Sequence, residues 1–378
     1  MDVNQIEKEY KVLLWNTYIH IMFIPDCTLV TACFDLSAYH TSSRTPEKAL
    51  KGIDVILKLP VYLIIYGNKA VLDIIKERRL SYGYETMSLF ICQEYEEIWA
   101  AQFTQQVKDN RSKYWPTRDV RTCAESHLIC CNKFDFVLKG MEMNPFQTSS
   151  FGWIDSNLHI DDNTIKICHQ YNMQRLPYVL NHIKKDKFHV QVMGSVDKKY
   201  KRADMKREYY EQYRWLISGC LFTCGIDLGQ KILNRLKNVM TETTMAGYGH
   251  GEEMLYLEVL DEFYNDIERS YGDYGQILNN FINITTNFYY VYSVIMVPTY
   301  EKQQYREAFD CCSKMLYSIE NHLLDGNLDY GLYISTMRHQ YYAATHCKPE
   351  ACEGIIKKVK HLAAINKSFD GALGGYIV

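Results

Sequence analysis

The sequence has no CxxC pair and no His/Cys spacing typical of a zinc site, although it contains 13 cysteines. We therefore expect reduced, mostly buried thiols. No apolar run approaches the roughly 20 residues of a membrane span. Residues 1–11 mix acidic and basic side chains, unlike the charged-then-apolar leader of a secreted protein. These absences predict a soluble, cytoplasmic protein without signal peptide or transmembrane segment.

Strong charge of either sign is also lacking. The net charge is −3 and the isoelectric point about 6.5, so the overall balance favours neither nucleic acid nor an anionic membrane as a partner. At 378 residues the chain is long for one domain and suggests two units or one enlarged α/β domain. Tyrosine, in contrast, is abundant: 31 side chains offer apolar surface with a polar tip, which suits sugar stacking and ordinary packing alike.

Apolar runs at residues 28–35 and 61–67 predict buried strands, and a helical pattern follows each of them. This order predicts a parallel sheet with right-handed crossovers. Further strands are expected at 151–155, 189–193 and 215–222, and helices at 46–57, 69–78, 94–108, 120–143, 228–239 and 254–263. From about residue 287 strand signals cease, and helical patterns such as 305–323 and 332–345 predict a helical extension.

One strand ends on a carboxylate, Asp155, which Ser156 and Asn157 follow. A carboxylate at the carboxyl edge of an α/β sheet can ligate Mg²⁺ or Mn²⁺, and the metal then neutralises the diphosphate of a sugar donor. The alternative is a loop Asp that only caps the next segment.

Four blocks, at residues 28–35, 132–146, 151–155 and 271–281, resemble in composition and order the HtrL/YibB-type (WlaTC-like) glycosyltransferase family. This family is similar to nucleotide-sugar transferases of the GT-A fold. The resemblance implies an α/β, GT-A-like domain at 28–284, with a mixed, mainly parallel sheet flanked by helices. A preface at 1–27 precedes it, and an all-helical extension at 285–378 follows. Ser156-Asn157 departs from the usual Asp-x-Asp, although Asn157 still offers a neutral oxygen to a metal.

The resemblance also implies positions for the donor. Thr31, Ala32 and Asp35 lie at the carboxyl edge of the first strand, where open α/β sheets bind nucleotides; a turn-capping role for Asp35 is the alternative. The cations available to a diphosphate include Arg44, Arg78, Arg79, Arg111 and Lys133. Lys133 is preferred because it lies in a matched block on the helix before Asp155, and Arg78 is kept as a second candidate.

Candidate catalytic residues come later in the chain. Glu252 and Glu253 follow a glycine-rich loop that includes His250, and either carboxylate suits the general base that an acceptor hydroxyl needs. Helix capping explains the same acids. Asp273 is a third candidate, toward the metal or the acceptor, with a turn Asp as its alternative.

These patterns predict a divalent-metal-dependent glycosyltransferase that moves a sugar from a nucleotide-diphosphate-sugar to an acceptor hydroxyl on a glycan, lipid or protein. Asp155 and Asn157 are the expected ligands of Mn²⁺ or Mg²⁺. Two alternatives stay open: a nucleotidyltransferase, which normally uses two or three converging carboxylates, and a catalytically inactive sugar-binding scaffold. The helical extension is expected to serve acceptor recognition, partner docking or homo-oligomer formation.

Overall fold

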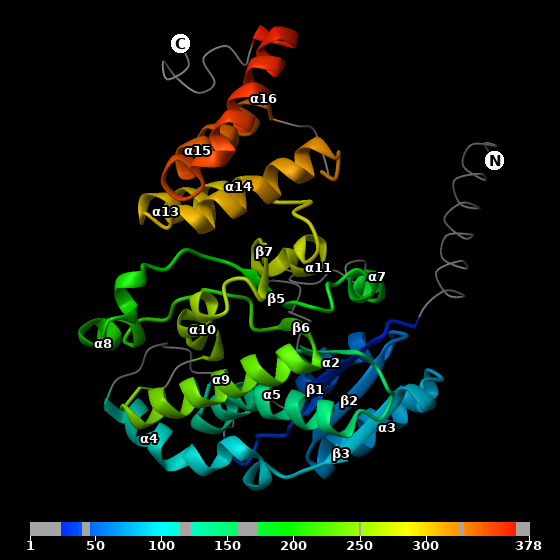
Figure 1. The fold of residues 1–378 in the computed structure, drawn as a ribbon. Coiled ribbons are helices and arrows are strands. Elements are labelled where there is room, and N and C mark those ends of the chain that lie inside the picture. The colour runs from blue at the N-terminus through cyan, green and yellow to red at the C-terminus, as the bar shows by residue number, and fades with distance from the viewer. Residues whose placement is uncertain are drawn as a thin grey trace, which may run out of the picture.

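The computed structural model describes residues 24–39, 46–113, 122–156, 173–248, 251–324 and 329–367. Within these ranges seven strands form one sheet, ordered β3-β2-β1-β4-β6-β5-β7 (Figure 1). The strands are β1 Cys27–Ala32, β2 Tyr62–Gly67, β3 Ser88–Cys92, β4 Ser150–Ile154, β5 Phe188–Val192, β6 Leu221–Gly225 and β7 Ile267–Tyr271. Only β6 runs against its neighbours. Six strands therefore end at the edge of the sheet where β6 begins.

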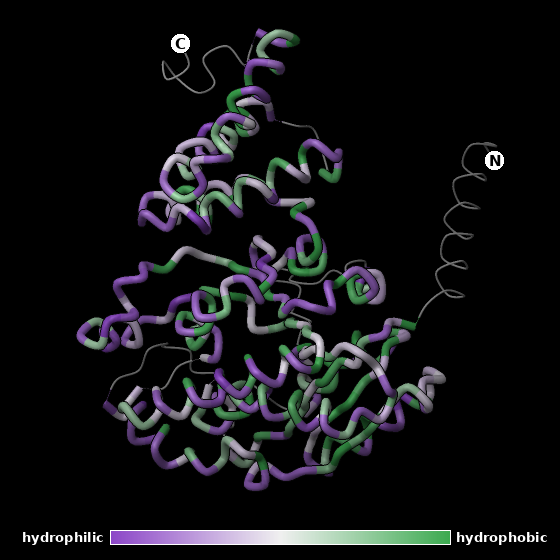
Figure 2. The backbone as a smooth tube through the Cα atoms, in the orientation of Figure 1, coloured by the Kyte–Doolittle hydropathy of each residue, from purple (hydrophilic) through white to green (hydrophobic). Residues whose placement is uncertain are grey.

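Helices cover both faces of this sheet, as predicted for an α/β fold. The α-helices are α2 Pro46–Leu57, α3 Lys69–Ser81, α4 Thr104–Lys113, α5 Ala124–Met143, α7 Leu176–Asn181, α8 Lys206–Tyr210, α9 Ile226–Met245, α10 Tyr256–Glu262 and α11 Ile277–Asn280. One face packs its core against α5 and α9, and the other packs against α2, α3, α7 and α11. Figure 2 shows the central strands as hydrophobic, which accords with their burial.

After β7 the described chain is helical. These helices are α12 Phe288–Tyr290, α13 Val297–Glu301, α14 Tyr305–Glu320, α15 Tyr330–Cys347 and α16 Cys352–Ile365, with a π-helical turn at Val291–Met296. Cys311 and Met315 of α14 join the core of the sheet, while Ile319 and Met337 belong to a separate small cluster between the last helices. No helix among the described residues is long and apolar enough to cross a membrane.

The helix α5 has defined ends because both are capped by side chains. At its start Cys123 Sγ accepts from the backbone of Ser126, and Ser126 Oγ accepts from the backbone of Cys123 at 2.9 Å. At its end Asn144 adopts the left-handed conformation (φ 33°), and its side chain bonds both main-chain groups of Thr148. These caps fix the position of the helix that carries Lys133.

The helix predicted over residues 94–108 is wrong in its first half. Two 3-10 helices, Tyr95–Glu97 and Trp99–Phe103, precede α4. Ile98 between them is extended (φ −74°, ψ 149°), so the α-helical hydrogen-bond ladder cannot run through it.

The strand predicted over residues 215–222 is displaced. A turn at Gly219 precedes β6, and only Ile217 makes an isolated bridge, to Val192. The prediction also missed β3 and β7. The strand β3 is only partly buried, and the middle of β7 is Glu268-Arg269-Ser270, so neither strand is marked as a buried apolar run.

A buried arginine joins α2 to the start of β2. Arg79 is fully buried, and its guanidinium donates to Leu57 O, Leu59 O and Val61 O, each at 2.7 Å. A fourth bond reaches Ser88 Oγ at 2.9 Å, in β3. Burial lowers the pKa of Arg79 to about 10, so the group stays charged at neutral pH.

We expect Arg79→Met to lower the free energy of unfolding by about 3 kcal/mol or more, because three buried carbonyls lose their donor. Urea unfolding followed by circular dichroism measures this change. Arg78→Met is the matched control: Arg78 is half-exposed and donates to Leu50 O, so its loss should cost under about 1 kcal/mol. Equal losses in the two variants would contradict the structural role of Arg79.

Candidate active site at the carboxyl edge of the sheet

The strand order reverses at β1. The chain adds β2 and then β3 on one side of β1 and returns to place β4 on its other side. In open α/β sheets ligands bind outside the carboxyl ends of the strands at such a switch point. Asp35 follows β1 and Asp155 follows β4 directly, so both lie at this edge.

Lys133 on α5 reaches the same edge and is 1% exposed. Its Nζ donates to Gly219 O at 2.8 Å and to Glu252 Oε1, and lies 3.3 Å from Asp155 Oδ1. Burial alone would lower the pKa of the Lys133 ammonium, but the carboxylates of Asp155 and Glu252 raise it well above its usual value. Lys133 is therefore a permanent positive charge that joins three separate segments.

Asp155 is anchored through one oxygen. Lys133 Nζ and Trp153 Nε1 both contact Oδ1, and the Asp155 backbone donates to Cys220 O at 2.9 Å. The side chain nevertheless keeps 32% of its surface exposed. The carboxylate is thus oriented from within while part of it stays open to a ligand.

Glu252 and Glu253 begin the 3-10 helix Glu252–Leu255, and the two carboxylates differ in environment. Glu252 is buried against Lys133, and a Cβ on Gly219 would lie 2.5 Å from Glu252 Oε1, so a larger residue there would displace the carboxylate from Lys133. Burial and the neighbouring Glu252 raise the pKa of Glu253 to about 8. A carboxyl group with a pKa near the working pH is suited to proton transfer.

Two tyrosines that sequence reasoning missed border this cluster. The Tyr213 hydroxyl and Glu253 Oε2 both lie beside Gly251, and burial with the charge of Glu253 raises the Tyr213 pKa far above its usual range. The pKa of Tyr274 is also raised well above its usual value, first by burial and then by its electrostatic interactions with Cys220 and Asp155. Both hydroxyls therefore stay protonated. Each comes from a segment distant in sequence, so no local pattern marked them.

Other predicted residues make their contacts elsewhere. Thr31 and Ala32 are buried within β1. Asp35 Oδ1 accepts from Ser37 N at 2.9 Å, the bond of a turn-capping Asp. Arg78 donates to a carbonyl of α2, away from the Lys133 cluster.

Asp273 follows β7 at the same edge of the sheet. Its Oδ2 accepts from Asn287 Nδ2, and its carbonyl accepts from Gln191 Nε2 at 2.6 Å. Its Oδ1 is buried and has no hydrogen-bond partner in the described part of the chain. Asp273 Oδ1 is thus an acceptor without a donor in the described chain. The residue that follows it is Tyr274, which borders the Lys133 cluster.

The described residues do not fit a metal ion by themselves. Among them no three Asp, Glu, His or Cys side chains converge as ligands. Asp155 offers one carboxylate whose Oδ1 already faces the Lys133 ammonium, and Asn157, the second predicted ligand, lies outside the described residues.

The sequence matches no protein-family model and no curated protein. Among solved structures, mouse xyloside xylosyltransferase 1 (apo form) aligns at 10% identity with a TM-score of 0.35, covering 69% of this chain and 94% of that one. The 4-diphosphocytidyl-2C-methyl-D-erythritol synthase of Anaerococcus prevotii aligns at 13% identity with a TM-score of 0.31, covering 71% and 94%. At these scores the likenesses carry no argument about function, and the HtrL/YibB resemblance stays a prediction.

We expect Lys133→Met to lower the free energy of unfolding by about 3–5 kcal/mol, because Asp155 and Glu252 would face each other without their cation. Lys139→Met on the same helix is the control. Lys139 is a half-exposed partner of Asp135, and its loss should cost under about 1 kcal/mol. Thermal and urea unfolding measure both variants. A Lys133 variant as stable as the Lys139 variant would show that the cluster does not depend on the ammonium.

The raised pKa of Glu253 predicts a pH dependence of stability. Its folded value of about 8 lies above the usual 4.5, so between these limits the folded state holds a proton that the unfolded chain has released. Stability should therefore fall as pH rises through this window, by at most about 1.4 kcal/mol per pH unit from this group. Glu253→Gln should flatten the slope, whereas Glu142→Gln, on the exposed end of α5, should not. Identical slopes in both variants would refute the assignment.

Proposed function

We propose that this protein is a GT-A-like glycosyltransferase that moves a sugar from a nucleoside-diphosphate-sugar to an acceptor hydroxyl. The convergence of Asp155, Lys133 and the Glu252-Glu253 pair at the switch point of the sheet carries the proposal. This arrangement puts an open carboxylate and a carboxyl group of pKa about 8 at the edge where α/β sheets bind nucleotides.

The donor contacts Asp155. Its open carboxylate surface accepts hydrogen bonds from hydroxyl groups of the donor sugar or ribose. An ammonium has three N–H donors, and Asp155, Gly219 O and Glu252 face those of Lys133. We therefore assign Lys133 as a positioning residue that holds Asp155 and Glu252, in place of the diphosphate contact that its sequence position suggested.

Glu253 is the proposed general base. As the acceptor oxygen forms its bond to the anomeric carbon, its proton passes to Glu253. The bond from that carbon to the diphosphate breaks, and the nucleoside diphosphate leaves with the electron pair. Glu252, fixed by Lys133, helps to raise the pKa of Glu253, which makes its carboxylate a stronger base near neutral pH.

The first test is thermal stabilisation by UDP, GDP, CDP and their sugars, with and without Mn²⁺. At 100 times its dissociation constant a ligand adds about 2.7 kcal/mol. We expect a base-selective shift that Asp155→Asn abolishes and that the surface control Asp73→Asn retains. The Mn²⁺ arm tests the predicted metal at Asp155 and Asn157.

Other outcomes identify the alternatives. A flat panel for well-folded protein would refute the transferase proposal and favour a sugar-binding scaffold. Binding of nucleoside triphosphates with release of pyrophosphate would instead indicate a nucleotidyltransferase. If the Glu253→Gln variant released nucleoside diphosphate from a donor sugar at the wild-type rate, Glu253 would not be the general base.

A further inference from the structure

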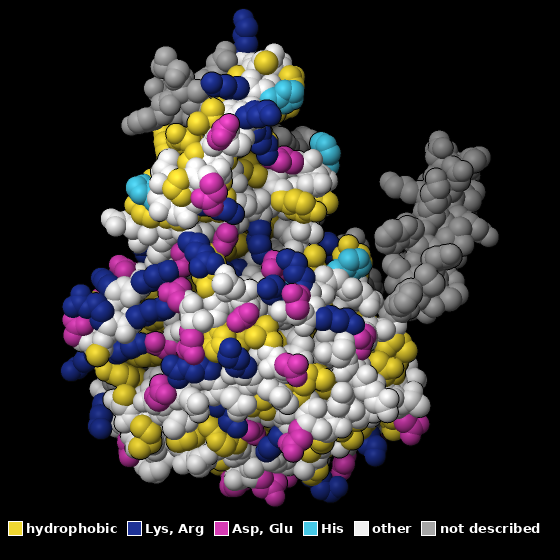
Figure 3. All heavy atoms as spheres, in the orientation of Figure 1, with side chains coloured by type: hydrophobic (Ala, Val, Ile, Leu, Met, Phe, Trp, Pro, Cys, Tyr) yellow, Lys and Arg dark blue, Asp and Glu magenta, His cyan; other side chains and the backbone are white. Residues whose placement is uncertain are grey.

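A hollow lies beyond the carboxyl end of β5. This hollow, the β5 cleft, has a volume of about 470 Å³, within the usual range of small-ligand sites. Its wall includes three cations and three aromatic side chains: Lys199, Arg214, Lys302, Tyr200, Tyr213 and Trp215. Figure 3 shows Lys and Arg side chains gathered on this side of the molecule, over α8.

The β5 cleft approaches the proposed base on the side of Tyr213. Tyr213 lines the cleft, and the charge of Glu253 contributes to the raised pKa of its hydroxyl. A Cβ on Gly251 would lie 2.5 Å from Glu253 Oε2 and 3.1 Å from the Tyr213 hydroxyl, so both groups pack closely against the same glycine. Glu253 Oε2 is buried without a hydrogen-bond partner in the described part of the chain. Tyr213 thus connects the wall of the cleft to the proposed base.

The cations of the cleft lack carboxylate partners. Within the described residues none of the three has an ion pair, and Asp197 is the one acid in the cleft wall. Arg214 is stacked 4.5 Å above the ring of Tyr200, which fixes its guanidinium, yet its Nε is buried without a partner in the described chain. Lys302 donates to Ser195 O at 3.1 Å. Arg214 Nη2 also donates to the Tyr200 hydroxyl at 3.1 Å and to Gln212 Oε1 at 3.2 Å, both neutral groups. The positive charges of the cleft therefore have no ion-paired carboxylate in the described chain and would attract an anionic ligand.

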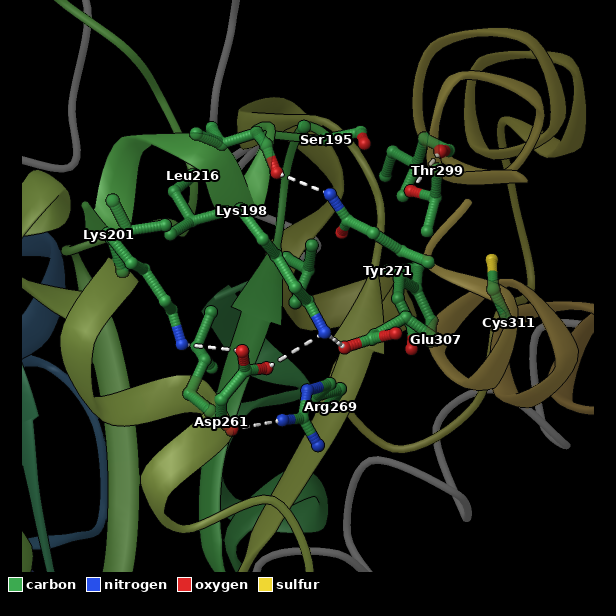
Figure 4. A pocket seen from close by; sticks show the side chains of 17 residues that line it. Ser195, Lys198, Lys201, Leu216, Asp261, Arg269, Tyr271, Thr299, Glu307 and Cys311 are labelled. Carbon is green, nitrogen blue, oxygen red and sulfur yellow. Dashed lines mark hydrogen bonds and ion pairs between the residues drawn. The ribbon is translucent and has the colours of Figure 1, made fainter. Parts of the chain in front are cut away.

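A neighbouring cavity provides the contrast. It measures about 60 Å³ and lies between β5, β7 and the helices α13 and α14 (Figure 4). Its lysines are paired: Lys198 contacts Asp261 at 3.2 Å and also Glu307, and Lys201 contacts the same Asp261. The charges there hold the helical extension to the domain, whereas those of the β5 cleft are left for a ligand.

Trp215 gives the cleft an apolar platform. Its side chain is 62% exposed, and the edge-on ring of Tyr213 supports it at 5.7 Å. A Cβ on Gly194 would lie 2.9 Å from Trp215 O, so the backbone here is closely packed. An exposed but fixed indole can stack on the apolar face of a sugar ring, and its position beside three cations selects a charged sugar.

We propose that the β5 cleft is the acceptor site and that the acceptor is an anionic saccharide, carrying a carboxylate or phosphate group. Its ring stacks on Trp215, its anion binds Arg214 and Lys302, and its reacting hydroxyl lies beside Glu253. The assignment as acceptor rests on the proposed transferase function, whereas the binding of an anionic sugar does not.

The test is direct binding of glucuronic acid, glucose 6-phosphate and glucose, by calorimetry and saturation-transfer NMR. At least one of the two anionic sugars should bind 10-fold or more tightly than glucose, and more weakly as salt rises. Trp215→Ala, Arg214→Gln and Lys302→Gln should each weaken that binding about 10-fold. Two surface controls, Tyr178→Ala on α7 and Lys69→Gln on α3, should leave it unchanged. Unfolding temperature checks that each variant is folded.

The outcomes separate the two proposals. Equal binding of glucose and both anionic sugars, no binding of any, or cleft variants that bind like the controls would overturn the inference, even if the nucleotide panel shows a shift. Competition between the anionic sugar and the nucleoside diphosphate would assign the cleft to the donor and overturn the acceptor role. Anionic-sugar binding without nucleotide binding would leave the cleft as a sugar site and refute the transferase.

Discussion

The ammonium of Lys133 is the interaction on which the candidate site depends. One buried cation faces oxygens from three segments: the end of β4, the turn before β6 and the 3-10 helix that begins at Glu252. Removing any one acceptor would leave charge or a donor buried without compensation. The same contacts orient Asp155 and set the environment in which Glu253 titrates near neutral pH. The stability of this region and the proposed chemistry therefore depend on the same contacts.

The reversed direction of β6 makes this convergence possible. Because β6 runs against β4 and β5, its first residues lie at the edge where the other strands end. Gly219 O can then accept from Lys133, and the absence of a side chain at Gly219 lets Glu252 approach. A parallel strand at this place would have put its amino end on the far edge of the sheet.

The sequence predicted the parts of the fold that depend on local pattern. Continuous apolar runs located β1 and β2, and helical periodicity located α2 to the residue. The strand β7 escaped because Glu268 and Arg269 lie within it, and Lys314 of α14, far along the chain, contacts both residues. The sequence marked Asp155, Glu252 and Glu253 as candidates, but it could not predict that Lys133 contacts both Asp155 and Glu252. Contacts between residues 119 positions apart leave no periodic signal.

The contact of the helical extension with the sheet has a consequence for how the protein can be divided. The core of one face of the sheet includes Val291, Ile295 and Met315, so it crosses the predicted boundary at residue 285. Lys302, which lines the β5 cleft, also lies beyond that boundary. A fragment ending there would expose apolar surface and lose one wall of the cleft at once. The smallest portion of the chain with a complete binding surface should therefore extend through α14.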